Sequence, residues 1–158
     1  MDLDQQIQEL YAKAPQDGTT PNAVMAIAPA LKQIAGQLKH PQYYVLQTLD
    51  ERWVTVTLNH QRQTNTQKNV LYAFATLADA KGNQASKNPQ VISVPVPVTH
   101  ILFQMVAMTS IDSIIFFDIP GNLNKGSEVH RDTFQKLIQM HLQQMQQAAP
   151  ASPPADMA

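Results

Sequence analysis

The chain has 158 residues, of which 44% are hydrophobic and only 15% are charged, and its formal net charge is −1. This length suits one domain with a hydrophobic core and is too short for two domains of ordinary size. The eleven Lys and Arg residues are scattered along the chain, so it lacks the basic stripe that neutralises successive phosphates, and we expect no nucleic-acid partner.

Two amphipathic helices are predicted within the first forty residues. Apolar side chains recur with the helical period over 3–11, and Pro15 ends this short helix. A second helix over 20–38 begins with a threonine suited to the N-cap, followed by Pro21 at the first helical position. Pro29 lies inside this helix and removes one backbone donor, so we expect the helix to kink or divide there.

Strands are predicted next, because the period of the apolar residues changes from the helical to the extended value. The segments 43–49 and 53–59 are rich in β-branched and aromatic residues and flank an acidic turn, which predicts an antiparallel hairpin. A third strand is expected over 70–77, between the polar loops 60–69 and 79–89.

The segment 90–98 is predicted to be a strand with one blunted edge. Its two prolines, Pro95 and Pro97, fall on the same parity. Because the N–H groups of residues i and i+2 point to the same side of a strand, these prolines remove donors from one edge and leave the other edge able to pair. The blunted edge should resist pairing with another chain.

A buried helix, a buried strand and a last helix complete the pattern. Residues 99–108 are apolar almost all round, which is typical of a buried helix, and Thr99 is placed to cap it. Residues 112–119 carry apolar side chains on both faces, which predicts a central strand. After a turn-rich loop, a helix with apolar residues at helical spacing is expected to begin near Ser127 or His130.

Together these segments predict an α+β fold with the order ααββββαβα, in which helices pack on an antiparallel or mixed sheet of about five strands. We expect residues 1–147 to form a single domain, made of a helical segment over 1–40 and of the sheet and C-terminal helix over 41–147. Residues 148–158 are mostly Ala, Pro and Ser. They are too poor in large apolar groups to offset the entropy of ordering, so we expect a disordered tail.

The compartment is inferred from the N-terminus and from the length of the apolar stretches, since the absence of cysteine says little about it. The chain contains no Cys, which excludes disulfides and cysteine-bound zinc. Its N-terminus is acidic and polar and lacks the basic and apolar regions of a signal peptide. The apolar stretches 91–98 and 101–119 are interrupted by His100, Gln104 and Asp112, so neither provides the ~20 residues that span a bilayer. We therefore expect a cytoplasmic protein with no transmembrane segment.

Three segments share a pattern with a known family: VISVPVPVTHILFQMV, then IDSIIFFDIPG, and then EVHRDTFQKLI. In this pattern the chain resembles the N-terminal domain of the SseB family, named for enhanced serine sensitivity. The likeness spans 91–142, and it implies a strand, a helix, a buried strand ending at a Pro-Gly turn, and a terminal helix. Where the family has Asn-Pro-Gly, this chain has Asp118-Ile119-Pro120-Gly121. The resemblance implies no known chemistry.

The loop 118–130 is the candidate functional loop. Asp118 ends a buried strand, a position where sheet proteins often mount catalytic carboxylates or metal ligands, and Asn122 and Glu128 add oxygen ligands for a hard cation. The spacing fits no calcium loop, and Asx residues in turns usually bond their own backbone. His130 completes the candidate set, but the five histidines form no helical i, i+4 pair. We therefore predict no catalytic residue, metal ligand or cofactor.

Two functions are compatible with the sequence. The first is a non-enzymatic adaptor or chaperone-like module that binds a protein partner or a second copy of itself through a sheet face or a terminal helix. A weakly charged surface and seven Met residues support it. The second is a small-molecule or metal-dependent enzyme that uses Asp118, Glu128 and His130. It requires Asp118 and a second ionisable side chain to converge in a concave pocket.

Overall fold

The computed structural model of the chain describes residues 2–14, 20–59, 67–83, 87–107 and 110–148. Within these ranges the chain forms five helices and a six-stranded mixed sheet. The predicted α+β fold with a mixed sheet is therefore confirmed. The predicted disordered tail falls outside the described residues, apart from its first residue.

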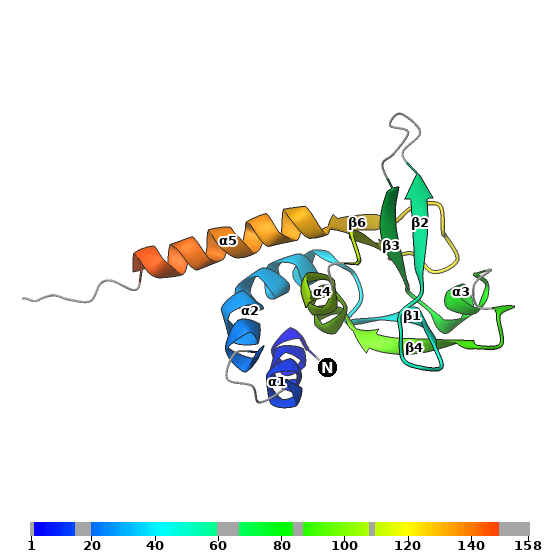
Figure 1. The fold of residues 1–158 in the computed structure, drawn as a ribbon, viewed down its shortest axis with the longest axis horizontal. Helices are drawn as coiled ribbons and strands as arrows, with labels where there is room; N and C mark the ends of the chain where they lie inside the picture. Colours follow the sequence, from blue (N-terminus) through cyan, green and yellow to red (C-terminus); the bar gives the residue numbers. More distant parts are fainter. Residues whose placement is uncertain (1, 15–19, 60–66, 84–86, 108–109, 149–158) are drawn as a thin grey trace, which may run out of the picture.

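The elements follow one another along the chain as α1 (Leu3–Lys13), α2 (Thr20–Gln37), β1 (Gln42–Thr48), β2 (Thr55–Asn59), β3 (Gln67–Phe74), α3 (Leu77–Lys81), β4 (Val91–Pro97), α4 (Val98–Ala107), β5 (Ser113–Phe117), β6 (Ser127–His130) and α5 (Arg131–Ala148). Helices α1, α2, α4 and α5 gather on one side of the sheet, and α3 lies on the other side (Figure 1).

The two N-terminal helices form where the apolar period predicts them. Asp2 caps α1 with a capping box, in which its carboxylate accepts from the Gln5 backbone N–H at 2.8 Å and the Gln5 side chain accepts from the Asp2 N–H at 2.9 Å. Helix α2 continues through Pro29 and changes direction along its length (Figure 1). The sequence predicts that this proline kinks or divides the helix; the helix is bent and is not divided.

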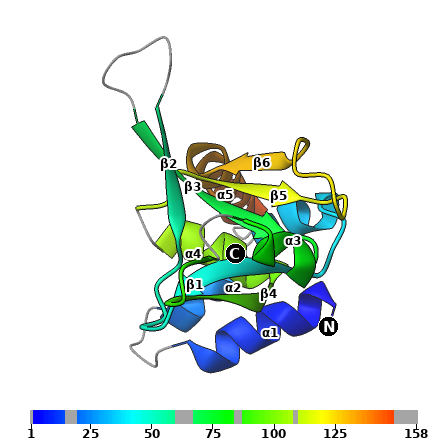
Figure 2. The same ribbon diagram turned by 90° about the vertical axis from the view of Figure 1, so that its right-hand side faces the viewer.

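The strands have the order β4-β1-β3-β5-β6, and β2 pairs with β3 beside this path. β3 and β5 are parallel, and the remaining pairs are antiparallel. β1 and β2 lie on the same side of β3, since β1 pairs with it at Phe74 and β2 pairs with it over 67–71, while β5 occupies its other side. Beyond the body of the sheet, β2 and the first half of β3 project as a two-stranded arm (Figures 1 and 2).

Side chains alternate between two faces of the sheet, which are covered differently. The face packed against α2, α4 and α5, called the main face, carries the larger core and includes Tyr43, Leu71 and Phe116. The opposite face, called the α3 face, carries a smaller cluster in which Phe74 and Phe117 pack with Leu46 and Ala80 of α3. Phe74 and Phe117 are stacked with their ring centroids 5.5 Å apart.

The predicted blunted strand is confirmed as an edge of the sheet. Among the described strands, β4 pairs with β1 alone, over seven positions that set Pro95 opposite Tyr44 and Pro97 opposite Gln42. The two missing N–H groups lie on the side turned away from β1, because the side that faces β1 must donate to the ladder.

Two elements were missed by the sequence prediction. Residues 127–130 form the short strand β6 and not the start of the last helix, which begins at Arg131. Within 79–89, which was predicted as loop, the chain continues the short helix α3, capped by the Thr76 hydroxyl 3.1 Å from the Asp79 N–H. In addition, no helix among the described residues combines the length and apolar character that a membrane span requires.

Candidate functional site

Asp118 stands directly after β5, and its side chain lies on the main face. The Tyr43 hydroxyl donates to one carboxylate oxygen of Asp118, and the Ser127 hydroxyl donates to the other at 3.4 Å. His40 Nε2 lies 2.6 Å from the backbone oxygen of Asp118. The carboxylate is therefore held by groups from β1 and β6, the strands on either side of the β3–β5 pair.

Tyr43 is the buried member of this cluster. Its side chain is 0% exposed, its ring packs edge-on against Phe116, and its hydroxyl accepts from the His40 backbone N–H at 3.3 Å. Burial raises the pKa of the Tyr43 phenol, and the hydrogen bond and negative charge of Asp118 raise it further. The phenol is therefore a fixed neutral donor and is unsuited to accept or release a proton near neutral pH.

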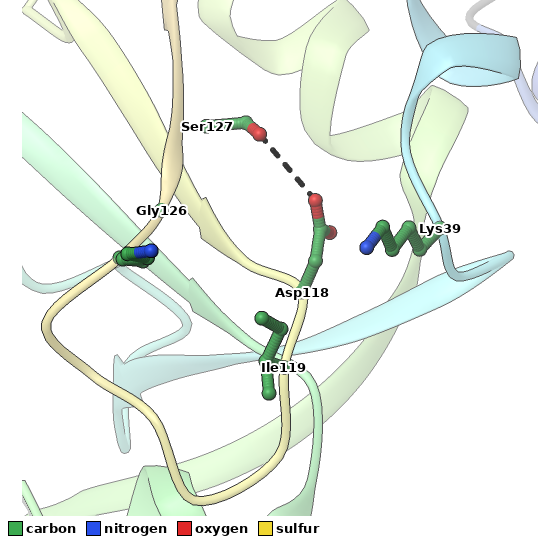
Figure 3. A pocket seen from close by; sticks show the side chains of 6 residues that line it. Lys39, Asp118, Ile119, Gly126 and Ser127 are labelled. Atoms are coloured by element: carbon green, nitrogen blue, oxygen red, sulfur yellow. Dashed lines mark hydrogen bonds between the residues drawn. The ribbon is translucent and has the colours of Figure 1, made fainter.

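A shallow hollow of about 160 Å³ opens beside Asp118, lined also by Lys39, Ile119, Lys125, Gly126 and Ser127. Figure 3 shows Lys39 and Asp118 pointing toward one another across it. Gly126 lies close against β5, because a Cβ at this position would lie 2.5 Å from Ile115 Cγ2. The hollow thus places the Asp118 carboxylate beside Lys39 at the surface, with Lys125 as a further lining residue.

Glu128 and His130 lie on the opposite face of the sheet. In the β5–β6 pairing, Glu128 is opposite Ile115 and His130 is opposite Ser113, and directly opposed residues share a face. Glu128 Oε2 accepts from Lys68 Nζ at 2.7 Å and from the Ser113 hydroxyl at 2.6 Å. The α3 face therefore holds Glu128 and His130, while Asp118 lies on the main face.

The charge of Glu128 is stabilised by its partners. Burial raises the pKa of this carboxyl, but the hydrogen bonds from Lys68 and Ser113 and the nearby His130 lower it more, and the net shift is downward. His130 Nε2 lies 3.7 Å from Glu128 Oε1. These contacts connect β6 to β3 across β5, so the role they indicate for Glu128 is to stabilise the sheet.

Asn122 has a third environment, inside the turn of the candidate loop. Its side-chain oxygen accepts from the Asn124 backbone N–H at 3.0 Å, which is the local Asx bond expected in a turn. The preceding Gly121 has φ +80°, a conformation that favours glycine, and its N–H donates to the Asp79 carboxylate at 3.0 Å. Helix α3 thus anchors the loop from the α3 face.

The four candidate residues therefore occupy three separate environments. In the described part of the chain, no group of three or more His, Asp or Glu side chains could hold a metal ion. The residues that do meet Asp118, namely Lys39, His40 and Tyr43, were not predicted. Tyr43 belongs to β1, and Lys39 and His40 belong to the segment between α2 and β1; only the strand order brings these residues, about 75 positions earlier in the chain, to Asp118.

A second unpredicted polar cluster joins α1 to α4. Gln6 is 1% exposed, and its side-chain oxygen accepts from the Thr99 N–H at 3.1 Å and from the Thr99 hydroxyl at 2.8 Å. Its amide nitrogen donates to the Pro41 backbone oxygen at 2.8 Å. Because α4 begins at Val98, Thr99 lies inside the helix and does not cap it as predicted; the Gln6 side chain accepts from the Thr99 N–H in the first turn.

His100 and His141 serve as hydrogen-bonding residues at separate positions. His100 Nε2 lies 3.1 Å from the Gln6 backbone oxygen, and burial lowers the pKa of its imidazole. His141 Nε2 lies 2.9 Å from the side-chain oxygen of Gln33, which joins α5 to α2. Both imidazoles bridge helices.

Comparison of the chain with known protein families, with curated proteins and with solved structures gave no match. The resemblance of 91–142 to the SseB family stays a prediction from the sequence pattern.

Proposed function

We propose that this protein is a non-enzymatic interaction module that binds an extended protein segment along β2. The binding surface is the outer edge of β2, defined as the backbone side of Thr55–Asn59 turned away from β3. Among the described residues, no strand pairs with this side. The observation that carries the proposal is the contrast between this edge and the two other edges of the sheet.

The other two edges are protected against pairing. β4 carries Pro95 and Pro97, which remove donors from its outer side. β6 is four residues long and carries Glu128 and His130. Short length, proline and charge are the devices with which sheet proteins discourage association through an edge.

The outer edge of β2, a strand of five residues, lacks two of these protections, proline and charge. The strand TVTLN contains no proline and no charged residue, and its threonines and valine favour extended backbone. It lies on the projecting arm, away from α1, α2 and α4 (Figures 1 and 2), and Thr57 at its centre is exposed. An extended segment could therefore add to the sheet there through main-chain hydrogen bonds.

The alternative, an enzyme that uses Asp118, Glu128 and His130, receives less support, because the ionisable side chain that meets Asp118 in a hollow is Lys39 and not Glu128 or His130. The sheet separates Asp118 from the other two residues. Both oxygens of Asp118 already accept hydrogen bonds, one of them from a phenol whose pKa is raised. The hollow beside Asp118 has lysines as its other ionisable groups, and we assign it no reaction.

The test is selection of binding peptides by the immobilised full chain from a displayed library of random linear peptides. We expect the selected peptides to be rich in β-forming residues. Their affinity for the Thr57→Lys variant should be at least about tenfold lower than for the unmodified chain. Their binding should also slow amide exchange over residues 55–59 of the protein. Thr133→Lys, an exposed threonine on α5, is the matched control and should bind as the unmodified chain does. Peptides that bind Thr57→Lys equally well, or that protect another segment, would refute the proposal.

A further inference from the structure

We infer that the segment bound along the outer edge of β2 is β2 of a second copy of this chain, paired antiparallel about a two-fold axis near Thr57. The inference rests on the proposed function and names its partner. It would join the sheets of two copies edge to edge through their arms, in a closed, symmetric dimer.

Side-chain chemistry favours this pairing of β2 with itself. About a two-fold axis, residues of one face meet residues of the same face, so Val56 and Leu58 would meet apolar counterparts on the α3 face. Thr55 and Thr57 would meet polar counterparts on the other face. Because Thr55–Asn59 contains no charged residue, no like charges would face one another within the strand.

The same operation on the other two edges is less favourable than on β2. Two β4 strands meeting through their outer edges would lack the donors that Pro95 and Pro97 cannot supply. Two β6 strands would meet over four residues at most, one fewer than β2 offers. The outer edge of β2 therefore favours self-pairing more than either of them.

Shape and net charge permit two copies to approach. The arm projects from the body in both views, so its outer edge can be reached without moving the helices (Figures 1 and 2). The formal net charge of −1 gives little long-range repulsion between copies. Lys68, on the inner strand of the arm, is paired with Glu128 at 2.7 Å, so its charge is locally balanced.

The size of the contact sets the expected strength of the dimer. Pairing through a five-residue strand buries less surface than the roughly 1,200–2,000 Å² that stable complexes bury. We therefore expect a reversible dimer whose fraction rises with concentration.

The experiment is sedimentation velocity of the full chain over a wide concentration range, with charge variants at Thr57. The Thr57 hydroxyl donates to Asn69 at 2.8 Å on the exposed surface, so its loss should leave the fold intact, which circular dichroism checks. We expect Thr57→Lys and Thr57→Glu to be monomeric when alone, because each places like charges at the axis. An equimolar mixture of the two should form dimers again, since Lys then meets Glu. Thr133→Lys and Thr133→Glu are the controls and should dimerise normally.

A measurement without substitutions complements the variants. In the unmodified chain, amide exchange over 55–59 should slow as concentration rises, while exchange over 91–97 should not change. A dimer that survives both Thr57 variants, or a mixture that stays monomeric, would overturn the inference. A monomeric chain that still selects peptides at β2 would overturn it and leave the proposed function standing, whereas a monomeric chain that selects none would overturn both.

Discussion

Gly126 gives the sharpest test of how the candidate loop packs on the sheet. A Cβ at this position would lie 2.5 Å from Ile115 Cγ2 and 3.2 Å from both the Phe116 backbone oxygen and Phe117 Cδ1. Carbon atoms in favourable contact lie about 3.5–4.0 Å apart, so Gly126→Ala must displace β5 or the loop. Overpacking of this kind costs about 1–3 kcal/mol, and we expect a loss of about 2 kcal/mol in the free energy of unfolding.

Urea and thermal unfolding measure this loss. For a chain of this size, about 2 kcal/mol corresponds to a melting temperature lower by roughly 4–8 °C. Gly36→Ala is the matched control, because a Cβ at Gly36, within α2, would meet no described atom within 4 Å. In a helix this change stabilises by about 0.5–1 kcal/mol, so the two Gly→Ala substitutions should have opposite signs.

A double-mutant cycle identifies the clash itself. Ile115→Ala removes Cγ2, the atom closest to the added methyl group, so Gly126→Ala should cost less in that background, with a coupling of about 1 kcal/mol. If Gly126→Ala unfolds at the same urea concentration as the unmodified chain, or costs the same with and without Ile115, the described packing of the loop is wrong.

Three further substitutions test the polar contacts and the turn of the hairpin. Tyr43→Phe removes the buried donor to Asp118 and should lower the free energy of unfolding by about 1.5–3 kcal/mol in urea; an unchanged value would contradict the described hydrogen bond. Glu51→Gly should stabilise the chain by about 1 kcal/mol, because Glu51 has φ +68°, where glycine is favoured; destabilisation would mean that the glutamate makes a compensating contact. The pKa of Glu128 is lowered from 4.5, so its contribution to stability is present above that pH and is lost as pH falls through the folded-state value. The stability difference between the unmodified chain and Glu128→Gln should therefore shrink from pH 7 to pH 3, and a difference independent of pH would refute this linkage.

Local pattern was sufficient for most of the elements. The apolar period of 3–11 and 20–38 predicted α1 and α2, because an amphipathic helix must turn one stripe of side chains toward a core. The apolar residues on both faces of 112–119 predicted β5, which pairs on both sides. Short elements were not predicted in this way. β6 carries a single apolar residue, Val129, so it has no apolar period, and its extended conformation is stabilised by pairing with β5.

The error at β6 also explains the separation of the candidate site residues. A helix beginning at Ser127 would have left Glu128 and His130 free to approach Asp118 at the end of β5. In a strand paired with β5, side chains alternate, so Glu128 and His130 point to the α3 face while Ser127 points toward Asp118. The partners Tyr43 and Lys39 could not be predicted, because no spacing rule links them to a residue about 75 positions away.

By itself the sequence determined that one strand has a blunted edge, because proline lacks an N–H group wherever it stands, and the positions of Pro95 and Pro97 fix which side loses its donors. Only the tertiary structure decided which strand is left unprotected. The sequence predicts Thr55–Asn59 to be the second strand of a hairpin with β1. In the structure β1 pairs instead with β4 and with the far end of β3, so the outer side of β2 is left at an edge of the sheet. Edge position depends on the order of all strands, which is set by packing across the whole sheet and not by any local pattern.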